Sequence, residues 1–306
     1  MKKKLLTVIM FAMLVLPTFA QKIPTVAQQY FELANAGYYF SPNNKISSSD
    51  VKTNMTELYA NAWAPFKISD KDVFVFGAGY DQVGFNYSPS VVDNLNLTEI
   101  NLQLIYQHAT DDNHKFSVIL WPKLSSDMES VGGNSLKGDL WFIFTKIKDE
   151  NIKFRHIVAA RYDFFGPELW YLFGMDWKIS DKAFFTMLIP QSIQYRYQFT
   201  PLCGAGILYT GNLGSYRLGD KYNDAYVYSR NGKAEVFGSF TFNDKLVWQI
   251  FAGFALGRSY KMYANDDKYS FMVDGIGIGK TLTQLNQDIL AGPVIETKLS
   301  YRIPVK

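Results

Sequence analysis

The stretch that decides the fold is Trp170 to Phe199, WYLFGMDWKISDKAFFTMLIPQSIQYRYQF. Its first arm alternates two sets of side chains: Tyr171, Phe173, Met175, Trp177 and Ile179 against Gly174, Asp176, Lys178 and Ser180. Successive side chains of a strand point to opposite faces, so the arm predicts a strand with one apolar and one charged face. The residues 179–182 predict a hairpin turn. Pro190 cannot donate to a ladder, which leaves open whether the second arm is one strand or two.

The same alternation recurs along the chain and predicts a protein made almost entirely of strands. Further predicted strands cover 31–40, 57–68, 74–81, 98–107, 115–125, 139–148, 154–164, 204–218, 233–242, 246–262 and 295–303. After residue 20 no apolar run approaches the roughly 18 residues that a membrane helix needs. No change in composition marks a second domain, so we expect one all-β domain over residues 21–306.

The first 20 residues have the pattern of a secretory signal peptide. Lys2, Lys3 and Lys4 precede an apolar run from Leu5 to about Phe19, and Ala20 lies at the expected cleavage position. The protein is therefore predicted to be exported. Its single cysteine, Cys203, has no partner for an internal disulfide.

The predicted connections are of two kinds. Short polar turns at 69–71, 111–113, 149–151, 180–182 and 243–245 alternate with longer stretches near 41–50, 126–138, 219–232 and 263–290. Short turns at one end and long loops at the other are typical of an outer-membrane barrel, whose short turns lie in the periplasm. The roughly 286 residues after Ala20, at about 20 to 24 per strand and connection, predict 12 or 14 strands.

Charged residues fall on one face of each predicted strand, and a closed sheet would gather them inside. We predict that nine of them face the lumen: Lys153, Arg155, Arg161, Asp163, Asp176, Lys178, Glu296, Lys298 and Arg302. A polar lumen accommodates such charges, whereas the core between two soluble sheets does not. The alternative is a soluble β-sandwich, in which these residues would face solvent and the aromatic residues would form the core.

Aromatic residues favour the barrel over the sandwich. They make up 16% of the chain, and Tyr80, Tyr106, Trp170, Tyr171, Trp177 and Tyr301 lie near predicted strand ends, as in the two aromatic girdles of a membrane barrel. Closure also leaves no unpaired edge in lipid. The fold predicted is therefore a closed antiparallel transmembrane β-barrel in the outer membrane of a Gram-negative cell, with membrane lipid and the barrel-assembly machinery as partners. The scattered lysines and arginines indicate no nucleic-acid partner.

Several motifs resemble an uncharacterised family of outer-membrane β-barrels, a domain of unknown function common in Bacteroidetes-type bacteria. They are Trp63-Ala64-Pro65, Trp121-Pro122, Ile189-Pro190, the Ser-Asp-Lys turns, and the final segment from Gly292 to Arg302. The resemblance covers nearly all of the chain after residue 20. It implies the barrel fold and the outer membrane, and it brings no catalytic residues.

Motifs that could carry enzyme chemistry are incomplete. The segment Gly275–Thr281 resembles a phosphate-binding loop, but Asp274 occupies the first glycine position and no buried strand precedes it. His108, His114 and His156 are the only histidines, and nothing in the sequence brings one of them to a serine and an orienting carboxylate. No spacing of His, Cys and Asp predicts a zinc site. We therefore predict no catalytic, cofactor or metal site.

The leading hypothesis for function is a non-enzymatic, porin-like barrel that passes or binds small solutes or hydrophobic compounds through its polar interior. One alternative is a structural or surface-interaction barrel whose lumen is closed and whose long loops engage partners. A lipid-modifying barrel enzyme is the third.

Overall fold

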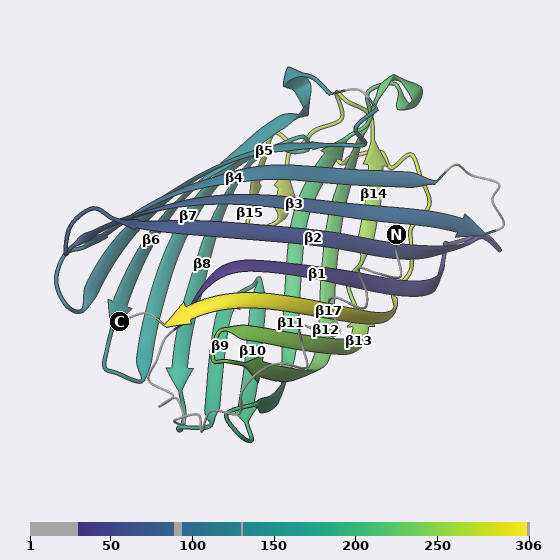
Figure 1. Cartoon of the computed structure of the whole chain (residues 1–306). Helices are drawn as coiled ribbons and strands as arrows, with labels where there is room; N and C mark the ends of the chain where they lie inside the picture. Colours follow the sequence, from purple (N-terminus) through teal and green to yellow (C-terminus); the bar gives the residue numbers. More distant parts are fainter. Residues whose placement is uncertain (1–29, 89–93, 130, 305–306) are drawn as a thin grey trace, which may run out of the picture.

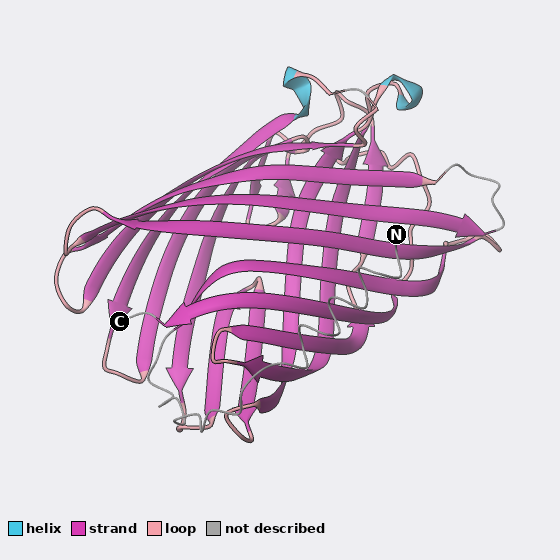
Figure 2. Ribbon diagram, viewed as in Figure 1, coloured by secondary structure: helices cyan, strands magenta, loops and turns pink. Residues whose placement is uncertain are grey.

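The computed structural model describes residues 30–88, 94–129 and 131–304, so the predicted signal peptide at 1–20 lies outside the described residues. Nearly all of the secondary structure there is strand, with two 3-10 turns, Gly133–Ser135 and Asp220–Tyr222 (Figure 2). No helix in this part of the chain is long and apolar enough to cross a membrane.

Eight strands follow one another in sequence order around the first part of the wall (Figure 1). They are β1 Tyr30–Lys45, β2 Lys52–Lys67, β3 Asp72–Ser88, β4 Leu95–Ala109, β5 His114–Ser126, β6 Leu136–Ile147, β7 Ile152–Asp163 and β8 Gly166–Lys178. Each strand is antiparallel to the next. This part of the wall is a meander in which sequence neighbours are also neighbours in space.

The second part of the wall is less regular. Its strands are β9 Ala183–Ile189, β10 Ser192–Gln198, β11 Cys203–Arg217, β12 Tyr226–Phe242, β13 Leu246–Ala255, β14 Ser259–Tyr263 and β17 Gly292–Pro304. β13 and β14 pair with successive parts of β12, so together they form one interrupted strand. β17 pairs with β13 on one side and with β1 on the other, which closes the sheet.

With β13 and β14 counted as one strand, the described residues form a closed antiparallel barrel of 14 strands. Of the two predicted strand numbers, 12 and 14, the larger is confirmed. Pro190 decides the number. Pro190 and Gln191 connect β9 to β10, so the second arm of the 170–199 stretch is two strands. A small hairpin, β15 Phe271–Val273 and β16 Ile276–Ile278, lies outside the 14-stranded ring.

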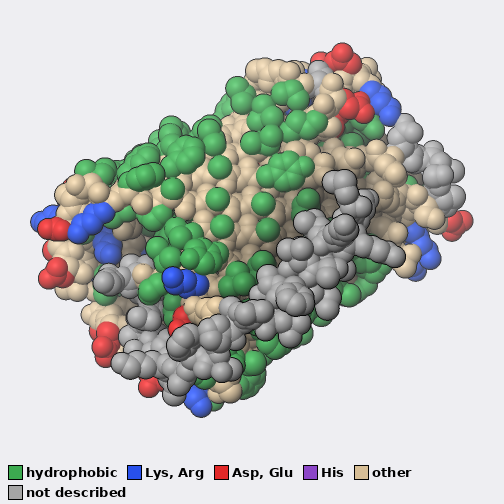
Figure 3. Space-filling model, in the orientation of Figure 1, with side chains coloured by type: hydrophobic (Ala, Val, Ile, Leu, Met, Phe, Trp, Pro, Cys, Tyr) green, Lys and Arg blue, Asp and Glu red, His purple; other side chains and the backbone are tan. Residues whose placement is uncertain are grey.

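Side chains alternate between the two sides of this wall as strand geometry requires. In β2, Leu58 is exposed, whereas the neighbouring Tyr59 lies inside and donates a hydrogen bond from its hydroxyl to Glu296 of β17, at 2.7 Å. Figure 3 shows hydrophobic side chains over the visible outer face and charged side chains mainly near its two ends. An apolar outer surface on a sheet without free ends is the arrangement that lipid requires of an outer-membrane barrel.

The connections differ at the two ends of the barrel, as predicted. Short connections at 68–71, 110–113, 148–151, 179–182, 199–202 and 243–245 share one end with the pair Tyr30 and Pro304. At the other end lie the connections 46–51, 127–135, 218–225 and 264–291, and also the two residues Phe164 and Phe165 between β7 and β8. We call these the short-turn end and the long-loop end.

Three predicted boundaries are wrong, and in the first two cases the reason is that polar residues continue on the inner face of long strands. Residues 41–45 belong to β1, where Ser41 and Asn44 are buried and hydrogen-bonded to each other at 2.9 Å. Residues 226–232 belong to β12, where all of them pair with β11 and residues 226–230 also pair with β14. The predicted strand 246–262 is interrupted at residues 256–258.

Candidate functional site

The barrel interior contains a cavity of about 600 Å³ near its middle. Its wall includes the aromatic side chains of Trp121, Trp141 and Trp170 together with charged residues of both signs. Several polar atoms of its lining residues are buried without a hydrogen-bond partner among the described residues, including Trp141 Nε1, Thr210 Oγ1 and Asn231 Oδ1. These groups are available to hydrogen-bond a solute in the cavity.

A network of buried ion pairs holds one side of this cavity. Arg161 lies 3.4 Å from Asp139, 3.0 Å from Glu168 and 3.5 Å from Asp163. Lys123 pairs with Asp139 at 2.7 Å. Each charge is a β5–β8 side chain on the inner face, and each is compensated by at least one opposite charge, which a buried charge requires.

A second group of charges lies across the cavity on β1, β12 and β17. Lys233 pairs with Glu296 at 2.7 Å, and Lys298 pairs with Glu32 at 3.2 Å. Lys233 also lies over the ring of Tyr39. The middle of the barrel therefore carries buried ion pairs on two sides of the cavity.

The nine predicted lumen residues divide between two places. Arg161, Glu296 and Lys298 line the central cavity. Lys153, Asp176, Lys178 and Arg302 line a second cavity at the short-turn end. Arg155 pairs with Asp176 at 2.6 Å, and Asp163 lies 3.7 Å from Lys137. That these nine residues line a solute passage stays a prediction.

An apolar patch lies on the inner wall and was not predicted from the sequence. It consists of the buried residues Ile157, Ala159, Trp170 and Leu172, with Leu188 and Leu213 packed against them. Trp170 corrects a prediction, because it is only 5% exposed and faces inward instead of joining an outer girdle. The signal was present: Trp170 and Leu172 share the parity of Asp176 in β8, and Ile157 and Ala159 share that of Arg155 in β7.

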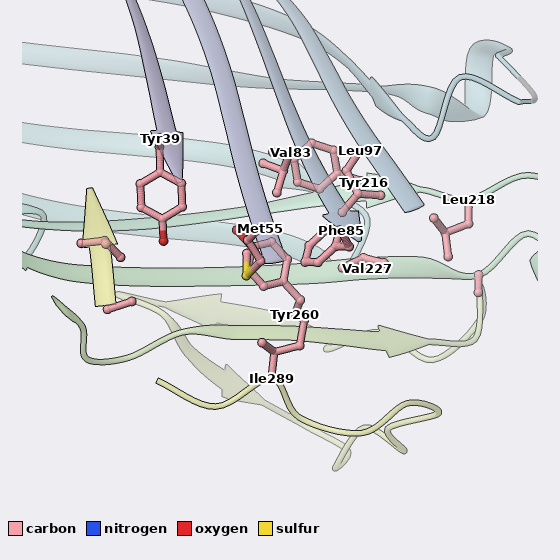
Figure 4. Close-up of a cluster of buried hydrophobic side chains, with 13 residues drawn as sticks. Tyr39, Met55, Val83, Phe85, Leu97, Tyr216, Leu218, Val227, Tyr260 and Ile289 are labelled. Carbon is pink, nitrogen blue, oxygen red and sulfur yellow. The ribbon is translucent and has the colours of Figure 1, made fainter. Parts of the chain in front are cut away.

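Hydrophobic side chains from opposite walls fill the interior at the long-loop end (Figure 4). Phe85 of β3 and Tyr260 of β14 meet edge to face with ring centroids 4.9 Å apart. Met55, Leu97 and Leu218 of the same cluster are fully buried. A packed core of this kind closes the direct axial route from the central cavity to this end.

The hydrogen-bonded wall is interrupted between β8 and β11. β9 ends with Ile189 opposite Phe173, and the β10 pairing with β11 ends at Thr210. Residues 166–172 of β8 and 212–217 of β11 therefore have no β9 or β10 partner, over roughly 20 Å of each strand. We call this region the wall break.

Side chains replace the missing strand along β11. Leu213 O accepts a hydrogen bond from Arg161 at 3.2 Å, and Ser215 O accepts one from Lys137 at 2.8 Å. At its end β11 crosses toward β5, where Arg217 pairs with Ser126. The unpartnered part of β11 is thus held by two buried cations and by the end of β5.

The β15–β16 hairpin covers the wall break on the side of β8, and Figure 1 shows β15 beyond the tip of the β9–β10 hairpin. β15 pairs in parallel with Glu168 and Leu169. Asp274 N–H donates to Leu169 O at 2.9 Å, and Tyr171 N–H donates to Asp274 Oδ1 at 2.8 Å. A Cβ on Gly275 would lie 3.3 Å from Leu213 and 3.4 Å from Trp170, so this turn fits between β8 and β11.

The loop that carries this hairpin is anchored by Asp267. Its carboxylate pairs with Lys280 at 2.8 Å and accepts a hydrogen bond from Thr283 N–H at 2.6 Å. These hydrogen bonds, the one from Lys280 first, lower the pKa of Asp267. The predicted phosphate-loop-like segment is part of this structure, since Ile276–Ile278 forms β16.

The histidines take separate positions. His108 lies 2.8 Å from Asp72, His114 lies beside Asp111 in a turn, and His156 lies 2.8 Å from the Tyr171 hydroxyl on the outer face. Among the described residues, no group of three or more His, Cys, Asp or Glu side chains could hold a metal ion.

Comparisons with known proteins yield distant structural likenesses. No family model matches the chain, and no curated protein matches it. The chain is similar to the COG4313 outer membrane channel from Pseudomonas putida F1, with 12% identity, a TM-score of 0.45, and 94% of this chain and 100% of that chain covered. It is also similar to the Pseudomonas putida toluene transporter TodX, with 8% identity, a TM-score of 0.43, and 89% of each chain covered.

A third likeness is to the NanC porin, with 9% identity, a TM-score of 0.37, and 89% of this chain and 100% of that chain covered. At these values the likenesses are distant, and they identify no substrate.

Proposed function

We propose that the barrel is a channel for small hydrophobic compounds, which move between the central cavity and the membrane through the wall break. The observation that carries this proposal is the contrast between two boundaries of the cavity. The axial route is filled by a packed core, whereas the wall break is covered by a hairpin with two three-residue arms.

The residues that line the route through the wall break favour an apolar solute. The inner patch around Trp170 and Leu172 adjoins the wall break, and on the outside Ile276 and Ile278 are exposed at 71% and 52%. A cavity of about 600 Å³ is in the ordinary range for a small-molecule site, which combines apolar walls with a few polar groups. The unpaired atoms of Trp141, Thr210 and Asn231 would orient such a solute.

Uptake of 1-N-phenylnaphthylamine by intact Gram-negative cells tests the proposal. This apolar dye fluoresces when it reaches a membrane interior, so cells that produce the protein should take it up several times faster than cells with an empty vector. Purified protein in planar bilayers should give no steady ion conductance, because the axial route is filled. Equal dye uptake with and without the protein would refute the proposal.

The closed long-loop end favours a second candidate, a structural or surface-interaction barrel. Deleting residues 270–279 distinguishes the two. A channel should take up the dye faster once its cover is removed, whereas a structural barrel should show no change in uptake and a loss of partner binding.

We also infer export, a non-enzymatic role and membership of the Bacteroidetes-type family that the Trp-Pro and Ile-Pro motifs resemble. Amino-terminal sequencing of the exported protein should begin at Gln21. Lipid composition should not change when His108, His114 and His156 are replaced. Homologues that keep Trp121-Pro122 and Ile189-Pro190 at the same strand positions would support the family assignment.

A further inference from the structure

A second cavity, of about 490 Å³, lies at the short-turn end of the barrel. It is formed by the first residues of β1, β7 and β9, by the ends of β8, β10 and β17, and by the turn between β6 and β7. The proposed hydrophobic route does not use it. The aromatic side chains of Tyr30 and Phe184 form part of its wall.

The acidic groups of this cavity are already engaged or lie at its rim. Asp176 binds Arg155 at 2.6 Å, and Glu32 binds Lys298 at 3.2 Å. Asp149 accepts the N–H groups of Asn151 and Ile152 within its own turn, at 2.8 and 3.0 Å. Glu150 is exposed in the same turn. None of these carboxylates forms an ion pair with either of the two arginines that line the cavity.

Those two arginines are Arg196 of β10 and Arg302 of β17. Among the described residues neither has a carboxylate within 4 Å. Arg196 lies over the ring of Phe184 at 4.9 Å, and Arg302 lies over the ring of Tyr30 at 3.9 Å. Arg302 also donates from Nε to Asp244 O at 3.4 Å. Stacking on a ring fixes the plane of a guanidinium and leaves its edge free to donate.

Two like charges in one cavity repel each other, and an anion between them would remove that cost. A guanidinium edge matches a carboxylate with two parallel hydrogen bonds. The aromatic walls suit a flat apolar body on the same molecule. We propose that this cavity binds the carboxylate of a small aromatic or aliphatic acid through Arg196 and Arg302.

The full-length protein in detergent micelles, titrated with benzoate by calorimetry, tests the site. Benzamide has the same shape without the charge, and it should bind at least tenfold more weakly. Arg196→Gln and Arg302→Gln should each weaken benzoate binding at least tenfold, because each removes a charge-assisted hydrogen bond. Arg196→Lys should recover only part of the loss, since lysine keeps the charge without the fork.

Two controls make the result specific. Lys182→Gln removes a cation from an exposed turn at the same end, and Arg230→Gln removes an exposed arginine of β12; both should leave benzoate affinity unchanged. Heat-modifiable gel mobility confirms that every variant is folded. The proposal fails if benzamide binds as well as benzoate, if inorganic phosphate binds as tightly, or if Lys182→Gln weakens binding as much as Arg196→Gln.

Discussion

The wall from β1 to β5 and the wall from β8 to β11 satisfy their backbone hydrogen-bonding groups in different ways. In the first, β2 and β3 pair without interruption from Lys52 with Ser88 to Lys67 with Val73. In the second, the ladder stops halfway, and side chains and a small hairpin bind the remaining backbone groups. A continuous ladder opens only when neighbouring backbone hydrogen bonds break together, whereas the wall break depends on a few separate contacts.

The difference locates the weak point of the barrel. All backbone groups of a lipid-facing wall must be satisfied, and at the wall break Asp274, Arg161 and Lys137 satisfy several of them. Each of these contacts can be removed by a single substitution, so the difference between the wall break and the continuous wall can be tested.

The largest effect is expected at Arg161. Arg161→Met leaves Asp139, Glu168 and Asp163 without a shared cation and also removes the donor to Leu213 O. Removing one partner of buried charge pairs costs about 3–5 kcal/mol, so the free energy of unfolding in urea should fall by that amount. Arg230→Met, on an exposed residue of β12, should change it by less than about 0.5 kcal/mol. A loss at Arg161 no larger than this would show that the network does not hold β11.

Locking the hairpin to β8 should nearly abolish dye uptake. In a Cys203→Ser background, Leu169→Cys with Val273→Cys would join the paired positions of β8 and β15. Oxidised cells should take up the dye at the empty-vector rate, and reduction should restore uptake. The matched pair Ala78→Cys with Leu102→Cys joins β3 to β4 in the continuous wall, where oxidation should have no effect. Full uptake through the oxidised Leu169–Val273 pair would exclude the wall break as the route.

A smaller, opposite effect is expected at Gly275. Its φ is +79°, and a side chain there would press on Leu213 and Trp170. Gly275→Val should therefore loosen the turn by about 1–3 kcal/mol and raise dye uptake severalfold. Gly257→Val is the control, because nothing lies within 4 Å of its Cβ position. Faster amide exchange at Tyr171 in the first variant alone would locate the change, and identical exchange in both would contradict it.

The alternation of side chains was enough to predict the fold. Asp176 and Trp177 lie on opposite faces of one strand, and the closed barrel with its two kinds of connection follows from repeats of that pattern. The sequence also indicates that the number of strands depends on Pro190. Whether the chain forms one strand or two around Pro190 could not be predicted, because a reversal at a proline depends on what the flanking arms pair with.

Which residues come together in the candidate sites was harder to predict from the sequence. The parity of Trp170 already indicated the inside, but its position near a strand end suggested a girdle. The wall break depends on residues 168 and 272, which are far apart in sequence and pair in parallel. Arg196 and Arg302 share a cavity because the sheet closes with a particular stagger, which no local pattern contains.

The smallest effect is expected from the protonation of Asp267, which anchors the loop that carries the hairpin. The pKa of Asp267 is lowered in the folded protein, so its pair with Lys280 stabilises the loop fully above the unfolded pKa, near 3.9. That stabilisation is lost as the pH falls through the folded pKa. Pepsin cleavage within 264–291, normalised to an unfolded substrate, should therefore accelerate as the pH falls from 4 toward 2. Asp267→Asn should be cleaved faster than the wild type at pH 4. Its cleavage rate should change little as the pH falls further, because the asparagine side chain does not titrate. The same pH response in the wild type and the variant would place the acid-sensitive contact elsewhere.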